Sequence, residues 1–172
     1  GDLSTEEYGV ILAASLADRG LRLGHSVGLA ACGQDPVWIP PRRTSGQLID
    51  ILRALAMARP GSRRVEELLD QVRPSMRSGA TMILITPDLR PAWISALLRL
   101  TRIGVTPTVL LFDPASFGGQ QHAWKMADWF QQHDITSTVI TADLLDQPVK
   151  EGHGGDWEWR IVGSGKAVPV RK

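Results

Sequence analysis

The stretch TMILITPDLRPAWISALLRL, residues 81–100, indicates the fold class more directly than any other part of the sequence. Its first six residues are mostly apolar and β-favouring, which predicts a buried strand over 81–86. A Pro-Asp pair interrupts this pattern, and apolar residues then recur at the spacing of an amphipathic helix. A strand that leads directly into a helix is the repeating unit of α/β domains, and here it places Asp88 at the corner between the two elements.

The same unit recurs along the chain. Strands are predicted at 26–32, 37–40, 81–86, 106–113 and 135–143, and helices at 4–20, 44–61, 64–76, 92–104 and 120–134. From residue 26 to residue 143 the order is therefore β-β-α-α-β-α-β-α-β. Nearly continuous apolar strands that alternate with amphipathic helices indicate a parallel sheet covered on both faces, and ligands of such sheets gather outside the carboxyl ends of the strands.

The helix predicted at 4–20 carries its own start signal, because Ser4 and Glu7 have the spacing of a capping box. Its buried stripe is expected to comprise Tyr8, Ile11, Leu12, Ser15 and Leu16. After residue 143 the rhythm changes to a polar, Gly-rich connector and a hairpin, WEWRIV-GSGK-AVPV. We interpret residues 1–143 as the α/β domain and residues 144–172 as a connector and hairpin packed on it.

Composition excludes several classes of protein. Nineteen basic side chains nearly cancel eighteen acidic ones, which does not favour nucleic acid as a partner. The single Cys32 excludes an internal disulfide and is expected to be an inert core thiol. No apolar run approaches eighteen residues, and the sequence shows no signal peptide, so no membrane contact is expected from this stretch. The chain begins without Met, and we interpret it as a fragment.

Polar residues at the ends of predicted strands are the candidate site. Thr44 precedes Gln47 at capping-box spacing, so it is either a helix N-cap or a ligand. Asp88 is either an Asx-turn residue before Pro91 or a ligand, and Asp113 either a turn former or a ligand. Asp143 fits a helix cap or a loop. The functional alternative for these residues is a set of oxygen ligands that converge on a hard cation such as Mg²⁺.

No enzyme motif stands out elsewhere in the sequence. The four histidines lack the spacing of a metal-ligand set and are expected at the surface. The sequence offers no nucleophile elbow, no phosphate loop after a strand, and no histidine paired with a candidate Ser or Cys. A metal-dependent hydrolase or phosphotransfer enzyme that uses Asp88 or Asp113 stays open as an alternative on this fold class.

Three segments carry a resemblance to a known family: EEYGVILAASLADRGLRLGHSVGLAACG, PPRRTSGQLIDILRALAMARPG and GATMILITPDL. They are similar to the later part of the bacterial proteins grouped as domain of unknown function 58, whose fold resembles the von Willebrand factor type A domain. The resemblance covers residues 6–119. It implies a three-layer α/β/α, doubly wound, mostly parallel sheet. It also implies a metal-ion-dependent adhesion site in which Thr44 and Asp88 match the second and third loops. Ser45 and Asp113 are further candidate binding residues beside this site.

The chain departs from the family pattern at one point. The first loop of that site, Asp-x-Ser-x-Ser, and the central strand before it do not occur in these 172 residues. The resemblance therefore implies a partial site that holds no metal in this chain, with Mg²⁺ or Mn²⁺ in the full-length protein. The missing strand would lie between 26–32 and 81–86. These two strands are expected either to pair directly or to accept the C-terminal hairpin or a strand from another molecule, which gives a homodimer or a strand swap.

The functional expectation also follows from the resemblance. It implies a non-enzymatic protein-interaction module that works with a MoxR-type AAA+ ATPase, on the cytoplasmic side of the inner membrane and tethered by upstream segments. The other open interpretation is a scaffold whose site has decayed.

Overall fold

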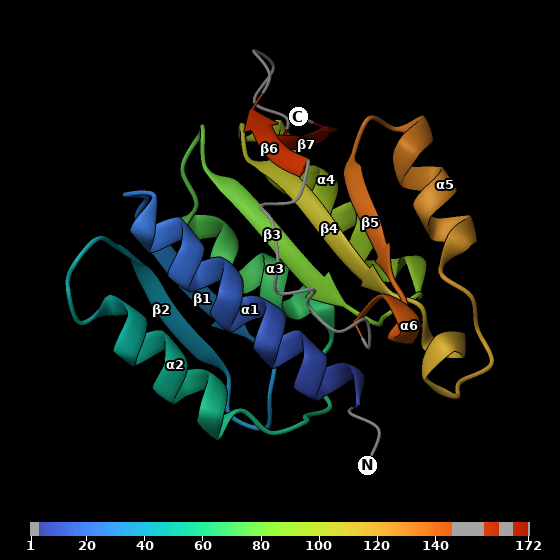
Figure 1. Ribbon diagram of the computed structural model, residues 1–172, viewed down its shortest axis with the longest axis horizontal. Helices are drawn as coiled ribbons and strands as arrows, with labels where there is room; N and C mark the ends of the chain where they lie inside the picture. The colour runs from blue at the N-terminus through green and yellow to red at the C-terminus, as the bar shows by residue number, and fades with distance from the viewer. Residues whose placement is uncertain (1–3, 146–156, 162–166, 172) are drawn as a thin grey trace.

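A computed structural model describes residues 4–145, 157–161 and 167–171 of the chain. The elements follow in the predicted order, and Figure 1 shows their arrangement. They are α1 (Thr5–Arg22), β1 (Val27–Ala31), β2 (Val37–Arg42), α2 (Gln47–Met57), α3 (Val65–Val72), η1 (Arg73–Ser75), β3 (Thr81–Thr86), η2 (Pro91–Trp93), α4 (Ile94–Arg102), β4 (Thr106–Phe112), η3 (Pro114–Phe117), α5 (Trp124–Gln132), β5 (Thr136–Ile140), α6 (Ala142–Leu145), β6 (Trp157–Ile161) and β7 (Ala167–Arg171).

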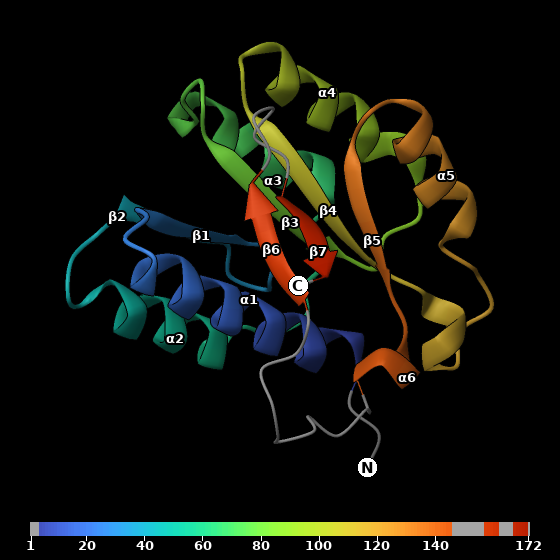
Figure 2. The same cartoon turned by 45° about the horizontal axis from the view of Figure 1, so that its top comes forward.

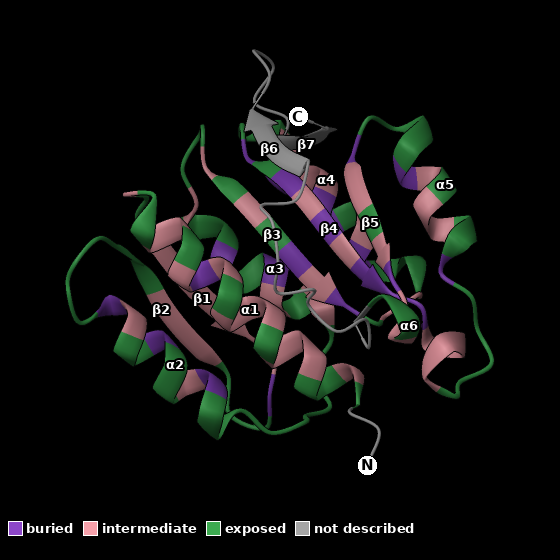
Figure 3. Cartoon of the chain, in the orientation of Figure 1, coloured by how far each residue is buried: buried purple, intermediate pink, exposed green. Residues whose placement is uncertain are grey.

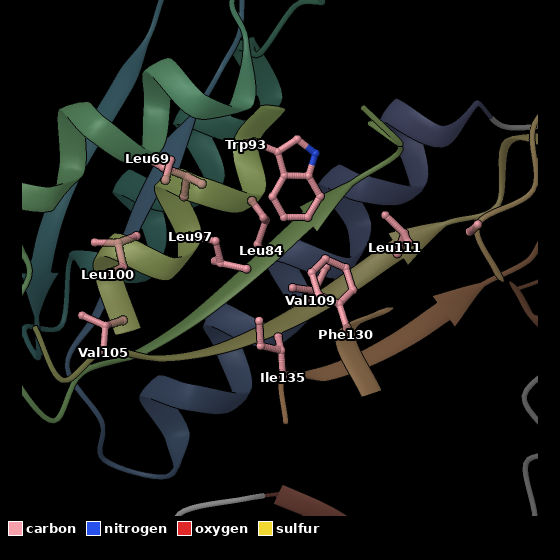
Figure 4. Close-up of a cluster of buried hydrophobic side chains, with 12 residues drawn as sticks. Leu69, Leu84, Trp93, Leu97, Leu100, Val105, Val109, Leu111, Phe130 and Ile135 are labelled. Atoms are coloured by element: carbon pink, nitrogen blue, oxygen red, sulfur yellow. The ribbon is translucent and has the colours of Figure 1, made fainter. Parts of the chain in front are cut away.

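A three-stranded parallel sheet forms the larger half of the molecule. Its strand order is β3-β4-β5, and Thr81 of β3 pairs with Thr106 of β4. Alternate residues of each strand point toward α3, α4 and α5, where they build the main core. Figure 4 shows this core, in which Trp93, Leu97 and Leu100 pack over Leu84 and Val109. The predicted parallel sheet is confirmed for this part of the chain.

The smaller half is built on the antiparallel pair β1-β2. Ile51 and Leu55 of α2 and Ala17 of α1 form a second buried cluster, against which Leu29 and Ile39 of the two strands pack. This cluster shares no buried residue with the core of the parallel sheet. The described chain therefore has two hydrophobic cores.

The two halves are not joined by strand pairing. Among the described residues, β1 pairs only with β2, and β3 pairs only with β4. Of the two alternatives that the sequence left open, direct pairing of β1 with β3 is therefore not observed. The C-terminal hairpin forms as predicted, but β6 pairs only with β7 in a sheet of its own, so the hairpin does not fill the position between β1 and β3.

Helix α1 crosses from one half to the other, as Figures 1 and 2 show. Its capping box is confirmed, because Glu7 N–H donates to Ser4 Oγ and Ser4 N–H donates to the Glu7 carboxylate. The expected buried stripe was wrong: Ile11 is 49% exposed, and the buried residue of this helix is Ala17. Small residues on the inner side allow close packing of the helix, and Ala13 and Ala14 lie beside the second cluster with Ala17.

Burial differs between β1, in the smaller half, and β4, at the centre of the parallel sheet. Figure 3 shows fully buried positions along β4, whereas every residue of β1 is only half-buried. The prediction of a buried strand over 26–32 was therefore correct in element type but not in burial. No helix among the described residues combines the length and the apolar character that crossing a membrane requires.

Candidate functional site at the carboxyl ends of the strands

The carboxyl ends of β3, β4 and β5 lie at one end of the molecule, near the start of α1. Gly9, in the first turns of α1, lies against Ile85 of β3 and Phe112 of β4. Asp88 and Asp113 follow the last residues of these two neighbouring parallel strands and so belong to the same edge of the sheet. Asp143 is exposed in the first turn of α6, just beyond β5. Sequence and structure agree on the placement of these three carboxylates.

The Asp88 carboxylate is fully engaged by Arg90. Its Oδ1 accepts hydrogen bonds from Arg90 N–H and Nε, both at 2.9 Å, and its Oδ2 lies 2.6 Å from Arg90 Nη2. The side-chain hydrogen bonds from Arg90 outweigh desolvation and lower the pKa of Asp88. The contact from Oδ1 to the N–H two residues on is the Asx-turn geometry, so the turn interpretation is confirmed. The backbone of Asp88 forms two further hydrogen bonds: its N–H donates to Thr86 Oγ1, and its carbonyl accepts from Trp93 Nε1.

Asp113 is a buried carboxylate with two partners that the sequence did not suggest. Its Oδ1 accepts the Ala123 N–H at 2.7 Å, and its Oδ2 lies 3.2 Å from His122 Nδ1. The His122 side chain is 65% exposed to solvent. The Asp113 carbonyl closes the turn by accepting the Ser116 N–H, as a turn former should. A buried carboxylate that orients an exposed histidine is an arrangement suited to proton transfer.

Ser116 lies beside this pair but is already occupied. Its Oγ donates to the Asp113 carbonyl at 2.8 Å and accepts the Ala142 N–H at 3.1 Å. These two bonds tie the loop after β4 to the start of α6. Ser116 therefore acts as a structural link between two strand ends, and no serine of the described residues hydrogen-bonds to His122.

Thr44 and Ser45 lie at the opposite end of the molecule from Asp88. They follow β2, which runs antiparallel to β1, so the carboxyl end of β2 lies beside Val27 at the start of β1. Gly20, near the end of α1, also lies against Val27. Gly9 and Gly20 are eleven residues apart, which corresponds to about 16 Å along a helix. The carboxyl end of β2, which Thr44 follows, therefore lies away from the carboxyl end of β3, which Asp88 follows (Figure 1).

The predicted capping box at Thr44 does not form. The N-cap of α2 is Gly46, without a side-chain hydrogen bond, and only the Thr44 carbonyl contributes, by accepting the Gln47 N–H. Gln47 has a different role. Its side-chain amide is buried, 2% exposed, and donates to the carbonyls of Val27 and Pro40 at 2.7 and 3.0 Å. Gln47 thus fastens α2 to both strands of the antiparallel pair.

The described residues do not fit the Mg²⁺ or Mn²⁺ site implied by the resemblance. No group of three or more His, Cys, Asp or Glu residues in the described part of the chain could hold a metal ion. Thr44 is remote from Asp88, and both oxygens of Asp88 already accept hydrogen bonds from Arg90. A cation at Asp88 would have to displace this guanidinium and find its other ligands elsewhere.

A shallow depression lies beside His122. It is lined by Leu89, Gln121, His122, Trp124, Lys125 and Met126 and encloses about 650 Å³. The exposed Trp124 and Lys125 side chains border it at the start of α5. The surface around the strand ends is thus broad and open, with charged and aromatic groups beside one another.

Comparison with family models, with curated proteins and with solved structures finds no match for this chain.

Proposed function

We propose that the chain is a non-enzymatic protein-interaction module of the von Willebrand A type. The single observation that carries this proposal is the interrupted sheet. The element order fits a doubly wound sheet from which one central strand is missing, and so do the edges of β1 and β3, which have no strand partner in the described part of the chain. This is the place where the family resemblance implies that strand.

The binding face in this proposal is the carboxyl end of β3 and β4. The Asp88–Arg90 pair and the Asp113–His122 pair lie there on a shallow surface. Salt bridges and partly exposed histidines on an open surface suit electrostatic recognition of another protein. The proposal uses no metal in this chain, since the described residues do not fit one. It assigns metal-assisted contact to a full-length protein that supplies further ligands.

The proposed partner is an AAA+ ATPase of the MoxR type, and the proposed location is the cytoplasmic face of the inner membrane. Both follow from the resemblance. The test is the affinity between this chain and a purified MoxR-type AAA+ ATPase, measured by biolayer interferometry. Asp88→Asn should weaken binding by about tenfold, because Arg90 is then left without its carboxylate and the face loses its shape and charge.

Asp18→Asn is the matched control. Asp18 also pairs with an arginine, Arg22 at 2.8 Å, but on the exposed side of α1. This control should change the affinity less than twofold, as surface pairs away from an interface do. Equal binding by wild type and Asp88→Asn would show that the carboxyl-end face is not the contact.

The second candidate is a hydrolase, and the Asp113–His122 pair is the observation that favours it. Asp113 could hold the imidazole in one tautomer while the exposed nitrogen takes a proton from water. Hydrolysis of p-nitrophenyl acetate and of bis-p-nitrophenyl phosphate distinguishes the candidates. Turnover that disappears in His122→Gln would favour the hydrolase, and rates equal to buffer for both proteins would favour the binding module.

A further inference from the structure

The depression beside His122 has the features of a binding site for a small ligand. Its volume of about 650 Å³ lies within the range of about 300 to 1,000 Å³ that is usual for ligand sites. Such sites combine apolar surface with a few polar groups that orient the ligand. The lining contains both kinds of group in equal number, three apolar residues and three polar ones: Leu89, Trp124 and Met126, and Gln121, His122 and Lys125.

The apolar residues of the lining are anchored in the main core. Leu89, in the loop after β3, and Met126, in the first turn of α5, are half-buried and pack against the core of the parallel sheet. Trp124 is 53% exposed, so much of its indole ring is in contact with solvent. An exposed indole beside a fixed apolar surface gains free energy when a flat apolar group covers both.

One buried carboxylate holds the polar side of the depression in place. Asp113 is 3% exposed. Its Oδ2 lies 3.2 Å from His122 Nδ1, and its Oδ1 accepts the Ala123 N–H at 2.7 Å. The first contact orients the imidazole, and the second fixes the backbone directly before Trp124 and Lys125. The lining is therefore arranged before a ligand arrives, which lowers the ordering cost of binding.

The charge of the lining selects the kind of ligand. Lys125 is exposed and forms no ion pair with any residue that the structure describes. Of the described residues, no aspartate, glutamate or arginine lines the depression. An anion at its surface thus meets one ammonium group and no repelling carboxylate. A single ammonium group matches a singly charged carboxylate, whereas phosphate is better matched by the forked donors of arginine.

Trp124 also borders a second depression, of about 540 Å³, between α5 and β5. Asp128 and Asp134 line this second depression, whereas no lysine or arginine of the described ranges does. An anion is therefore disfavoured there, although the same indole is available to it. The two depressions share one aromatic ring and differ in charge, so the position at which an anion binds distinguishes them.

We propose that the depression beside His122 binds a small aromatic carboxylate. The aromatic ring of the ligand packs against Trp124, Leu89 and Met126, and its carboxylate accepts hydrogen bonds from Lys125 and Gln121. The proposal does not rest on the contact with an ATPase, because it concerns this chain alone. It also requires no turnover, so it is independent of the hydrolase alternative.

The probe is 2-naphthoate, whose fused rings are close to an indole in size and which contains no bond for a hydrolase to cleave. Titration into ¹⁵N-labelled protein, followed by NMR, should shift the indole N–H signal of Trp124 and the amide signals of His122 and Lys125. The dissociation constant should be on the order of 0.1 to 1 mM. The amide signals of Thr136 and Ser137, which line the second depression, should move little.

Two control compounds separate charge from shape. 2-Naphthamide has the same rings without the negative charge, and it should bind about tenfold more weakly than 2-naphthoate. Cyclohexanecarboxylate has the charge without the flat aromatic rings, and it should also bind about tenfold more weakly.

Variants locate the groups that bind. Lys125→Gln removes the ammonium group and should weaken 2-naphthoate binding about tenfold. Arg102→Gln is the matched control, because it removes a positive charge from an exposed position at the end of α4, near the amino end of β4. This control should change the dissociation constant less than twofold. Trp124→Leu should weaken binding severalfold and leave the fold intact, since Trp124 is half exposed.

Four outcomes would overturn the proposal. Equal affinity of Lys125→Gln and Arg102→Gln would show that the Lys125 ammonium group does not bind the carboxylate. Equal affinity for 2-naphthoate and 2-naphthamide would show that the site does not select anions. Tighter binding of 2-naphthyl phosphate would assign the site to aryl phosphates instead. Signal shifts centred on Thr136 and Ser137, or no shifts up to about 10 mM ligand, would show that the depression beside His122 is not the site.

Discussion

At the scale of single residues, the Asp88–Arg90 pair makes stability depend on pH. The hydrogen bonds from Arg90 lower the pKa of Asp88 in the folded chain, whereas the unfolded chain has an ordinary value of about 4. An aspartate whose pKa is lower in the folded chain than in the unfolded chain stabilises the fold. This stabilisation is complete at pH values above the pKa of the unfolded chain, and it is lost as the pH falls through the pKa of the folded chain. The pair should therefore stabilise the folded chain at pH 7, by the small amount that is usual for an ion pair with an exposed partner.

Urea unfolding of wild type and Arg90→Gln, at pH 7 and at pH 2.5, measures this contribution. The variant should be less stable at pH 7, and the difference should shrink at pH 2.5, where protonation of Asp88 weakens the pair in the wild type. Arg22→Gln is the control, because the Asp18–Arg22 pair lies on an exposed helix face. An equal difference between wild type and Arg90→Gln at both pH values would contradict the prediction.

Cys32 provides a second prediction at this scale. Burial is the main cause that raises the pKa of this thiol, and its Sγ lies 3.6 Å from the Arg64 carbonyl. Less thiolate is then present at pH 8 than in a free cysteine, and the thiolate is the reactive form. Cys32 should react with Ellman's reagent about tenfold more slowly than glutathione, and urea should abolish the difference. A native rate equal to that of glutathione would contradict this explanation.

At the scale of elements, Gln47 is the link between α2 and the pair β1-β2. Gln47→Ala removes both donors, so the buried carbonyls of Val27 and Pro40 lose their partner. An unsatisfied buried polar group costs about 1 to 3 kcal/mol, and the free energy of unfolding should fall by that amount. Gln71→Ala, at an exposed position of α3, should change it by less than about 0.5 kcal/mol. Similar values for the two variants would show that the hydrogen bonds of Gln47 contribute little.

The sequence predicted individual helices and strands more accurately than it predicted contacts between them. The strand and helix at 81–100 and the capping box of Ser4 follow from local periodicity and spacing, which residues near in sequence determine. Local periodicity does not determine the placement of Thr44, because that placement depends on β2 running antiparallel to β1. Gln47 and its partner Val27 are 20 residues apart, and Asp113 and His122 are 9 residues apart. No short-range sequence pattern encodes these contacts.

The candidate site shows the same limit. The sequence placed Asp88 and Asp113 correctly at the ends of two neighbouring strands, since each directly follows an apolar run. It did not indicate that Arg90 would occupy both oxygens of Asp88, although the two residues are only two positions apart. A basic residue two positions after a turn-forming aspartate was the available signal.

At the scale of the whole molecule, two separate cores without a shared strand predict two steps of unfolding. The smaller core holds Ile51, and the larger core holds Leu97; both side chains are fully buried. Truncation of either to alanine should cost about 2 to 5 kcal/mol. Cooperative units that share few contacts open independently, so each substitution should act mainly on its own half.

Native-state hydrogen exchange tests this prediction. Ile51→Ala should speed exchange in β1, β2 and α2 while β3, β4 and β5 keep their protection. Leu97→Ala should speed exchange in β3 to β5, and α1, which contacts both halves, should respond to both substitutions. Uniform loss of protection in either variant would instead indicate one cooperative unit.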